Sequence, residues 1–202
     1  MTDPRAVLFD LGGVLIDWDP RHLYRKVFSP EETERFLAQV CTAQWNLELD
    51  AGRPWPEAIA EKQAAWPRYA QAIGWWHTRW AEMLNGPIQG TVDILKELRD
   101  RGVPLYALTN WSAETFPFAR ERFDFLGWFR DIVVSGEVGL VKPDPAIFRL
   151  TAARCGLDPA GTVFIDDSPV NVEAAKALGF DAIHFSGAEN LRKSLMERGF
   201  FN

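Results

Sequence analysis

Apolar runs and helical spacings alternate along the chain and predict an ordered series of elements. Short, continuous apolar runs occur at five places, residues 7–9, 103–108, 131–135, 162–165 and 181–185. Such runs are typical of strands buried on both faces of a parallel sheet. Segments with helical spacing lie between them, at residues 91–101, 113–123, 145–155 and 170–178. Strands that alternate with helices predict an α/β fold, a parallel sheet with helices on both faces.

Residues 18–85 show a different pattern, without a convincing strand. Ser29-Pro30-Glu31-Glu32 combines an N-cap residue, a proline and acidic side chains, which together indicate a helix start. Three helices are expected here, from residue 30 towards Ala43, from residue 55 to a break at Pro67, and through residues 75–84 to a stop signal at 85–87. We therefore predict an all-helical domain, residues 18–85, inserted into an α/β core domain of residues 1–17 and 86–202.

The composition limits the partners that the chain can have. It has 202 residues, of which 47% are hydrophobic and 25% are charged, and its net charge is -6. A negative balance argues against nucleic acid as the main partner. No apolar run is long enough to span a bilayer, and the first residues lack the basic and apolar regions of a signal peptide. A cytoplasmic protein is expected, with Cys41 and Cys155 as buried thiols rather than a disulfide.

Polar side chains stand where the predicted strands end. They are Asp10 after the first strand, Thr109-Asn110 after the second, Lys142 beyond the third and Asp166-Asp167 after the fourth. Neighbouring parallel strands lie about 4.8 Å apart, so these groups can share one crevice at the carboxyl edge of the sheet. Three carboxylates at one site repel each other unless a cation holds them, and oxygen ligands with room for water suit Mg²⁺. Lys142 can balance the remaining charge and hold an anionic substrate.

These motifs resemble, in kind and in order, those of the haloacid dehalogenase (HAD) superfamily of hydrolases. The first motif contains an aspartate, the second Thr-Asn, the third Lys-Pro and the fourth Asp-Asp, and they extend from residue 7 to about residue 180. The resemblance implies a Rossmann-like parallel sheet. The helical insertion after the first motif is similar to the cap of subclass I of the superfamily. Each motif alone is weak, but the ordered set is specific.

The resemblance also implies what the motif residues do. Asp10 matches the nucleophile that becomes an aspartyl phosphate, and Lys142 matches the lysine that pairs with this nucleophile and with the phosphate. Thr109 and Asn110 match the groups that bind the phosphoryl oxygens. The resemblance therefore implies a phosphatase.

The same resemblance implies a set of magnesium ligands. They are Asp10, the backbone carbonyl of Gly12, Asp167 by direct contact and Asp166 through water. Asn171 follows Asp167 by about one helical turn, so its side chain can support the acidic pair.

Gly12 departs from the family pattern, in which phosphatases usually have a second aspartate that serves as general acid and base. Glycine can do neither, and such help is typically worth about 10²–10⁴-fold in rate. Three explanations stay open: a good leaving group, a substitute side chain, or a slow or non-catalytic protein. The substitutes considered are Asp17, Asp19, His22 or a residue of the helical insertion. Separately, Trp45-Asn46 and residues 50–53 of the insertion form a polar and aromatic stretch that is expected to line the substrate side.

The expected function is Mg²⁺-dependent hydrolysis of a small phosphorylated metabolite, with a sugar phosphate as one candidate, by a monomer or homodimer. The alternative enzyme is a 2-haloacid dehalogenase, which uses an aspartate and a lysine without metal and is compatible with Gly12. Asp166-Asp167 disfavours it, because acids there would repel a haloacid carboxylate. The alternative from another class is a binding or regulatory module that keeps the HAD fold without turnover.

Overall fold

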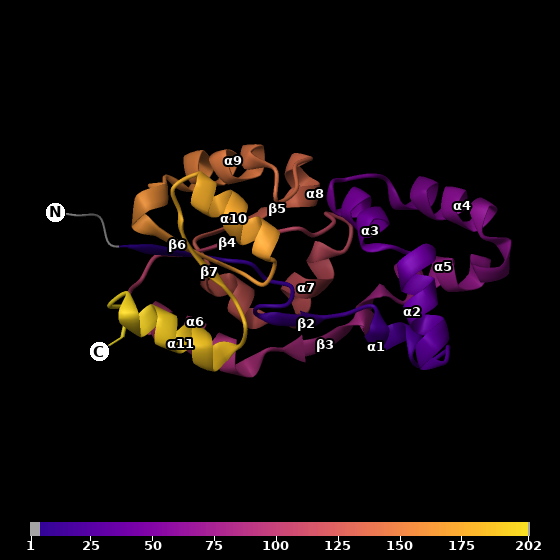
Figure 1. Ribbon diagram of the computed structural model, residues 1–202, viewed down its shortest axis with the longest axis horizontal. Helices are drawn as coiled ribbons and strands as arrows, with labels where there is room; N and C mark the ends of the chain where they lie inside the picture. Colours follow the sequence, from indigo (N-terminus) through magenta and orange to yellow (C-terminus); the bar gives the residue numbers. More distant parts are fainter. Residues whose placement is uncertain (1–4, 202) are drawn as a thin grey trace.

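A five-stranded sheet with the order β5-β4-β1-β6-β7 lies at the centre of residues 5–201, the part of the chain that the computed structural model describes (Figure 1). Its strands are β1 (Ala6–Phe9), β4 (Leu105–Thr109), β5 (Asp131–Val134), β6 (Thr162–Asp166) and β7 (Asp181–His184). Every neighbouring pair is parallel. The predicted parallel sheet is confirmed, and β1 occupies its centre, so that β4 and β6 flank the strand that carries the first motif.

Helices cover both faces of the sheet because successive side chains of a buried strand point in opposite directions. Leu8 of β1 packs in a cluster with residues of α9 (Pro145–Cys155) and α10 (Pro169–Ala177). Val7 and Phe9 pack in the other cluster, with residues of α6 (Gln89–Asp100) and α11 (Ala188–Glu197). Figure 1 shows these two helix pairs on opposite sides of the strands. The Rossmann-like α/β architecture predicted from the sequence is confirmed.

A separate group of helices lies beyond one end of the sheet (Figure 1). It consists of α1 (Arg21–Tyr24), α2 (Pro30–Gln39), α3 (Ala43–Asp50), α4 (Trp55–Ala65), η1 (Pro67–Tyr69), α5 (Ala70–Thr78) and η2 (Trp80–Met83). Tyr24, Phe36 and Trp76 are buried and pack with neighbouring rings in its interior. The aromatic residues of this segment therefore form a core of their own, continuous with one face of the sheet.

The helix predicted from residue 30 towards Ala43 is wrong at its end, because it stops at Gln39 and a second helix begins at Ala43. Thr42 has an extended conformation, and its side chain accepts a hydrogen bond from the Trp45 amide at 3.2 Å. It is therefore the N-cap of α3, and a threonine favours this position. The start at Ser29 and Pro30 is confirmed, since the Ser29 hydroxyl accepts from the Glu32 amide.

The prediction that residues 18–85 contain no strand is wrong only at the two ends of that range. β2 (Ile16–Trp18) and β3 (Leu84–Pro87) form a two-stranded antiparallel sheet, so residues 85–87 extend a strand instead of ending a helix. The helix predicted through residues 75–84 ends at Thr78. These strands connect the central sheet with the helical group. The predicted boundaries between the α/β core domain and the helical domain, at residues 17/18 and 85/86, fall within this two-stranded sheet. They stay a prediction.

Smaller differences concern element ends and short elements. The helix predicted over 113–123 begins three residues later, as α7 (Phe116–Arg122), and η3 (Asp124–Trp128) follows it. The structure adds the elements α8 (Ser135–Val138), η4 (Pro159–Gly161) and α11 to those predicted. Cys41 and Cys155 are free thiols, Cys41 being buried and Cys155 partly so. Over residues 5–201, no helix is both long and apolar enough to cross a membrane.

Hydrogen bonds at Trp55 and at Asp50 join the helical group to the loops at the carboxyl edge of the sheet. The buried Trp55 indole donates from Nε1 to Ser112 Oγ at 2.7 Å. Ser135 Oγ donates to the Asp50 carbonyl oxygen at 2.6 Å and accepts from the Trp111 amide at 2.8 Å. Residues 50–55 are thereby held against the strand ends of β4 and β5.

The Ser112→Ala variant tests the contribution of the first contact. It leaves the buried Trp55 N–H without its acceptor, which is expected to lower the free energy of unfolding by about 1–3 kcal/mol. Urea unfolding measures the loss. The matched control is Ser186→Ala, whose hydroxyl is exposed and accepts from Asn190. An equal, small effect of both substitutions would contradict the contribution assigned to Ser112.

Candidate active site

Asp10 stands at the carboxyl end of the central strand. Its main-chain amide continues the sheet by donating to the Ile165 carbonyl at 2.8 Å, and the residue is only 7% exposed. The Leu11 amide donates to Asp10 Oδ1 at 2.7 Å. The buried apolar strand therefore delivers a carboxylate to the edge of the sheet in one fixed orientation.

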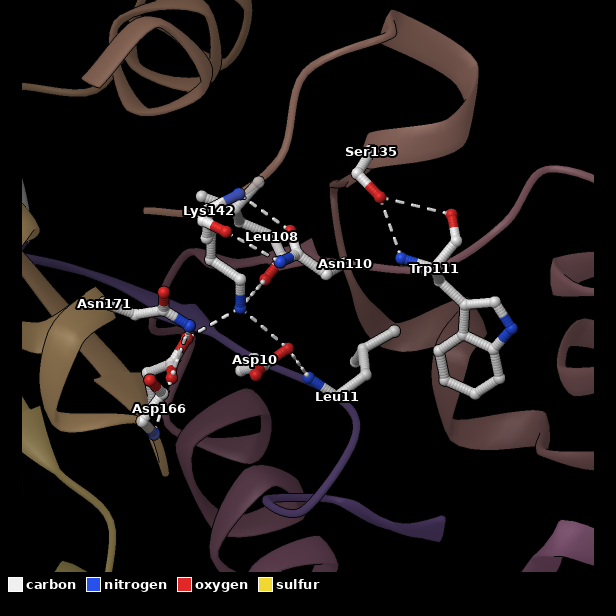
Figure 2. Close-up of polar contacts among 10 residues, drawn as sticks. Asp10, Leu11, Leu108, Asn110, Trp111, Ser135, Lys142, Asp166 and Asn171 are labelled. Atoms are coloured by element: carbon white, nitrogen blue, oxygen red, sulfur yellow. Dashed lines mark hydrogen bonds and ion pairs between the residues drawn. The ribbon is translucent and has the colours of Figure 1, made fainter. Parts of the chain in front are cut away.

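Lys142 reaches this carboxylate from the loop between α8 and α9 (Figure 2). Its ammonium contacts three oxygens, Asp10 Oδ1 at 2.9 Å, Asp166 Oδ2 at 2.6 Å and the Leu108 carbonyl at 3.0 Å. The side chain is almost fully buried. Burial opposes the charged form, but Asp10 and Asp166 outweigh it and raise the pKa of Lys142. All three donors of the ammonium are thus used on oxygens of three neighbouring strands.

Asn110 positions the main chain of this lysine. Its Nδ2 donates to the Lys142 carbonyl at 2.9 Å, and its Oδ1 accepts from the Lys142 amide at 2.8 Å (Figure 2). Sequence reasoning assigned Asn110 only to the phosphoryl oxygens. It missed this contact because the partner lies 32 residues away. Thr109, the residue before Asn110, is buried at the end of β4.

Asp166 is completely buried and its carboxylate has several donors. Oδ1 accepts from the Ser168 amide at 2.8 Å, Asn171 Nδ2 lies 3.0 and 3.1 Å from its two oxygens, and Oδ2 contacts Lys142. Figure 2 shows Asn171 directed at this carboxylate. The structure therefore brings Asn171 to Asp166, the inner member of the acidic pair.

Asp10, Asp166 and Asp167 form a group whose ligand atoms all lie within 4.8 Å of one another. Burial raises the pKa of Asp10; Lys142 lowers it in part, and Asp166 raises it again. Burial and the neighbouring Asp166 also raise the pKa of Asp167. The single ammonium thus leaves negative charge uncompensated. A cluster of oxygen donors with excess negative charge fits a hard divalent cation such as Mg²⁺.

Two glycines follow Asp10 and differ in their surroundings. Gly13 has φ +72°, and a Cβ there would overlap with the Asp167 carboxylate. Gly12 has open space, because a Cβ built on it meets nothing within 4 Å. Gly13 is therefore required by backbone conformation and by the approach of Asp167, whereas the structure would accept a side chain at Gly12.

A small pocket lies between this loop and the helical group. Its lining residues are Gly12, Trp18, Asn46, Asp50, Trp80, Asn110 and Trp111. Asn46 and Asp50 come from α3, so part of the polar stretch suspected from the sequence does face the core loops. Trp45 is buried between helices, and Arg53 pairs with Glu48 and Glu61.

The other side chains considered as substitutes for an acid at position 12 are engaged elsewhere. His22 Nε2 lies 2.9 Å from Asp17 Oδ1, and Asn85 donates to Asp17 Oδ2 at 2.8 Å. These hydrogen bonds, that of His22 first, lower the pKa of Asp17. Asp19 accepts from the Arg21 amide at 2.8 Å. These residues are absent from the described lining of the pocket beside Gly12.

The site combines a buried aspartate with a paired lysine at the edge of a Rossmann-like sheet, and an inserted helical group lies over that edge. This combination defines a class of α/β hydrolase. The comparison with known families identifies it further. Residues 4–179 match the family described as haloacid dehalogenase-like hydrolase. The chain belongs to this family.

Relatives of known name are similar over most of the chain. The sesquiterpene phosphatase astK of Aspergillus oryzae is 26% identical, over 92% of this chain and 91% of its own length. A phosphorylated carbohydrates phosphatase of Thermotoga maritima is 26% identical, over 96% and 91%. Other relatives are longer: the chain covers 19% of acyl-CoA dehydrogenase family member 10 of Mus musculus and is 29% identical to it.

Solved structures share the fold. A HAD family enzyme of Bacteroides thetaiotaomicron superimposes with a TM-score of 0.73 at 23% identity, covering 95% of this chain and 98% of the other. That enzyme has also been solved with magnesium, and with magnesium and inorganic phosphate. At this identity the likeness supports the architecture of sheet and helical group.

Alanine substitutions at the two glycines are expected to differ in their effect on the free energy of unfolding. Gly13→Ala is expected to lower the free energy of unfolding by at least about 1–2 kcal/mol, because the backbone is left-handed and the new methyl group overlaps with Asp167. Gly12→Ala, the matched control, is expected to stay within about 0.5 kcal/mol. Urea unfolding without added metal measures both. Equal effects would contradict the assignment of the close approach to Gly13.

Proposed function

We propose that the protein is a Mg²⁺-dependent phosphatase that hydrolyses a small phosphorylated metabolite through an aspartyl phosphate on Asp10. The observation that carries this proposal is the group of Asp10, Asp166 and Asp167, which has more negative charge than Lys142 can balance. Relatives named as phosphatases, one of them for phosphorylated carbohydrates, support this reaction class.

Asp10 would attack phosphorus with the oxygen that its neighbours leave free. The contacts of its side chain with Lys142 and with the Leu11 amide both involve Oδ1, so Oδ2 can face the substrate. The phosphorus–oxygen bond to the leaving group then breaks, and water later releases phosphate from Asp10. Lys142 holds the nucleophile and adds positive charge beside the transferring group.

Phosphoryl oxygens would be bound at the end of β4. Thr109 stands there next to the nucleophile strand, since β4 pairs with β1. Asn110 uses one Nδ2 hydrogen on the Lys142 carbonyl, which leaves the second hydrogen for an oxygen of the substrate. The same residue would thus hold the lysine loop and contact the substrate.

The residues that would hold Mg²⁺ are Asp10, Asp167, the Gly12 carbonyl and, through water, Asp166. The donors already bound to Asp166 favour the indirect contact, because Lys142, Asn171 and the Ser168 amide occupy its oxygens. Bound Mg²⁺ supplies positive charge that stabilises the phosphoryl oxygens in the transition state. The helical group, residues 18–85, would act as a cap that excludes bulk water and selects the substrate.

The central prediction concerns the nucleophile. The wild-type protein is expected to release phosphate from a panel of phosphate esters, including anomeric and terminal sugar phosphates, only with Mg²⁺. Asp10→Asn should abolish this release, because an amide cannot form the aspartyl phosphate, while circular dichroism shows an unchanged fold. Metal-independent halide release from 2-chloropropionate would instead identify a dehalogenase. A folded, metal-binding protein without either activity would indicate a binding module.

Metal binding has a readout that does not require turnover. Mg²⁺ at about a hundred times its dissociation constant is expected to stabilise the protein by about 2.7 kcal/mol, measured as a rise in melting temperature. Asp167→Asn should remove most of this rise, because it replaces one of the three carboxylates that would hold the ion with a neutral amide. Asp93→Asn, at an exposed helix position, is the control and should keep it. A rise that survives Asp167→Asn would refute this ligand.

A further inference from the structure

The pocket beside Gly12 contains one titratable side chain among its described lining residues, and it is the carboxyl group of Asp50. This residue is the last of α3 and comes from the helical group, whereas Gly12 and Asn110 come from the core loops. Gly12 itself leaves the space of a side chain empty. A carboxyl group is therefore present in the space that adjoins the nucleophile loop, although the chain has none at position 12.

Asp50 is held by a directed chain of hydrogen bonds. The Trp76 indole, which can only donate, contacts Asn46 Oδ1 at 3.2 Å and so fixes the orientation of that amide. Asn46 Nδ2 in turn donates to Asp50 Oδ2 at 2.8 Å. The Asp50 main chain is fixed as well, because its carbonyl accepts from Ser135 Oγ at 2.6 Å. Oδ2 of the carboxyl group is thus anchored within the helical group, and the Asp50 side chain is held where it lines the pocket.

The environment suits a carboxyl group that exchanges a proton. Burial raises the pKa of Asp50 to about 7, against the opposing effect of the Ser112 main-chain amide. A catalytic acid works best when its pKa lies near the working pH. In contrast, hydrogen bonding lowers the pKa of Asp17, the alternative acid in the first linker.

Aromatic and amide side chains form most of the pocket wall. Trp18, Trp80 and Trp111 line it together with Asn46 and Asn110. Among these described lining residues, Asp50 alone supplies a carboxyl group.

We propose that Asp50 is the general acid and base of this enzyme, acting from the cap in place of the residue that Gly12 lacks. The inference rests on the proposed function. As Asp10 attacks phosphorus, the electron pair of the breaking phosphorus–oxygen bond goes to the leaving oxygen, which takes the proton of the Asp50 carboxyl group. The Asp50 carboxylate then takes a proton from the water that attacks the aspartyl phosphate. The alcohol and phosphate are released, and Asp10 and Asp50 return to their starting states.

The dependence on leaving group tests this step. An alkyl phosphate such as glycerol phosphate needs a proton on its leaving oxygen, whereas p-nitrophenyl phosphate needs little help. Asp50→Asn should therefore reduce kcat for the alkyl ester by about 10²–10⁴-fold and kcat for the aryl ester by less than about 10-fold. Asparagine keeps an acceptor for Asn46, and the aryl ester activity shows that the variant is folded. Glu57→Gln, an exposed acid of α4, is the matched control and should change neither rate.

A rescue variant separates an acid from a merely structural residue. Gly12→Asp places a carboxyl group where a Cβ meets nothing within 4 Å. Added to Asp50→Asn, it should restore at least about 10-fold of the alkyl ester rate. Equal losses on both esters, or no loss on either, would overturn the inference while Asp10-dependent phosphate release keeps the proposed function. A wild-type protein without such release would overturn both.

Discussion

The site depends on one buried interaction, the lysine ammonium held between two carboxylates. Lys142 is 2% exposed, Asp166 is fully buried and Asp10 is nearly so. Removing such charges from water costs several kcal/mol for each ion, which only close pairing and further hydrogen bonds offset. The adjacent strands β4, β1 and β6 supply the partners, Leu108, Asp10 and Asp166, at the correct spacing. The apolar interior of the sheet is therefore what makes the charged edge possible.

Much of this arrangement follows from local sequence patterns. The sequence alone predicts that Asp10, Lys142 and Asp166 lie close together. Buried parallel strands end at a common edge of the sheet, and each of these residues stands at or beyond the end of such a strand. The same rule placed Thr109 at that edge. The strand runs themselves were recognisable since they are apolar on both faces.

The remaining features depend on contacts between distant segments. β2 and β3 are short, and only their pairing across the whole helical insertion makes them strands. From the sequence, the Asn110 amide is predicted only to bind substrate. Its two hydrogen bonds with the Lys142 main chain become visible only in the folded structure. The position of Asp50 depends on how the helical group sits over the core, which periodicity along the chain does not encode. At each of these points, sequence reasoning was wrong or incomplete because the deciding contact is not local.

Ser135 links the two halves of the site through one hydroxyl, which contacts both the Asp50 carbonyl and the Trp111 amide. Separation of the helical group from the core would break this link and carry Asp50 away from Gly12. A proton donor carried in this way is present only while the two parts are in contact. A substrate too large for the two parts to close around it would reach Asp10 without having Asp50 beside its leaving group. Such a substrate would bind but be hydrolysed slowly. The enzyme would then select substrates by size through the turnover rate, even if it bound large and small substrates equally well.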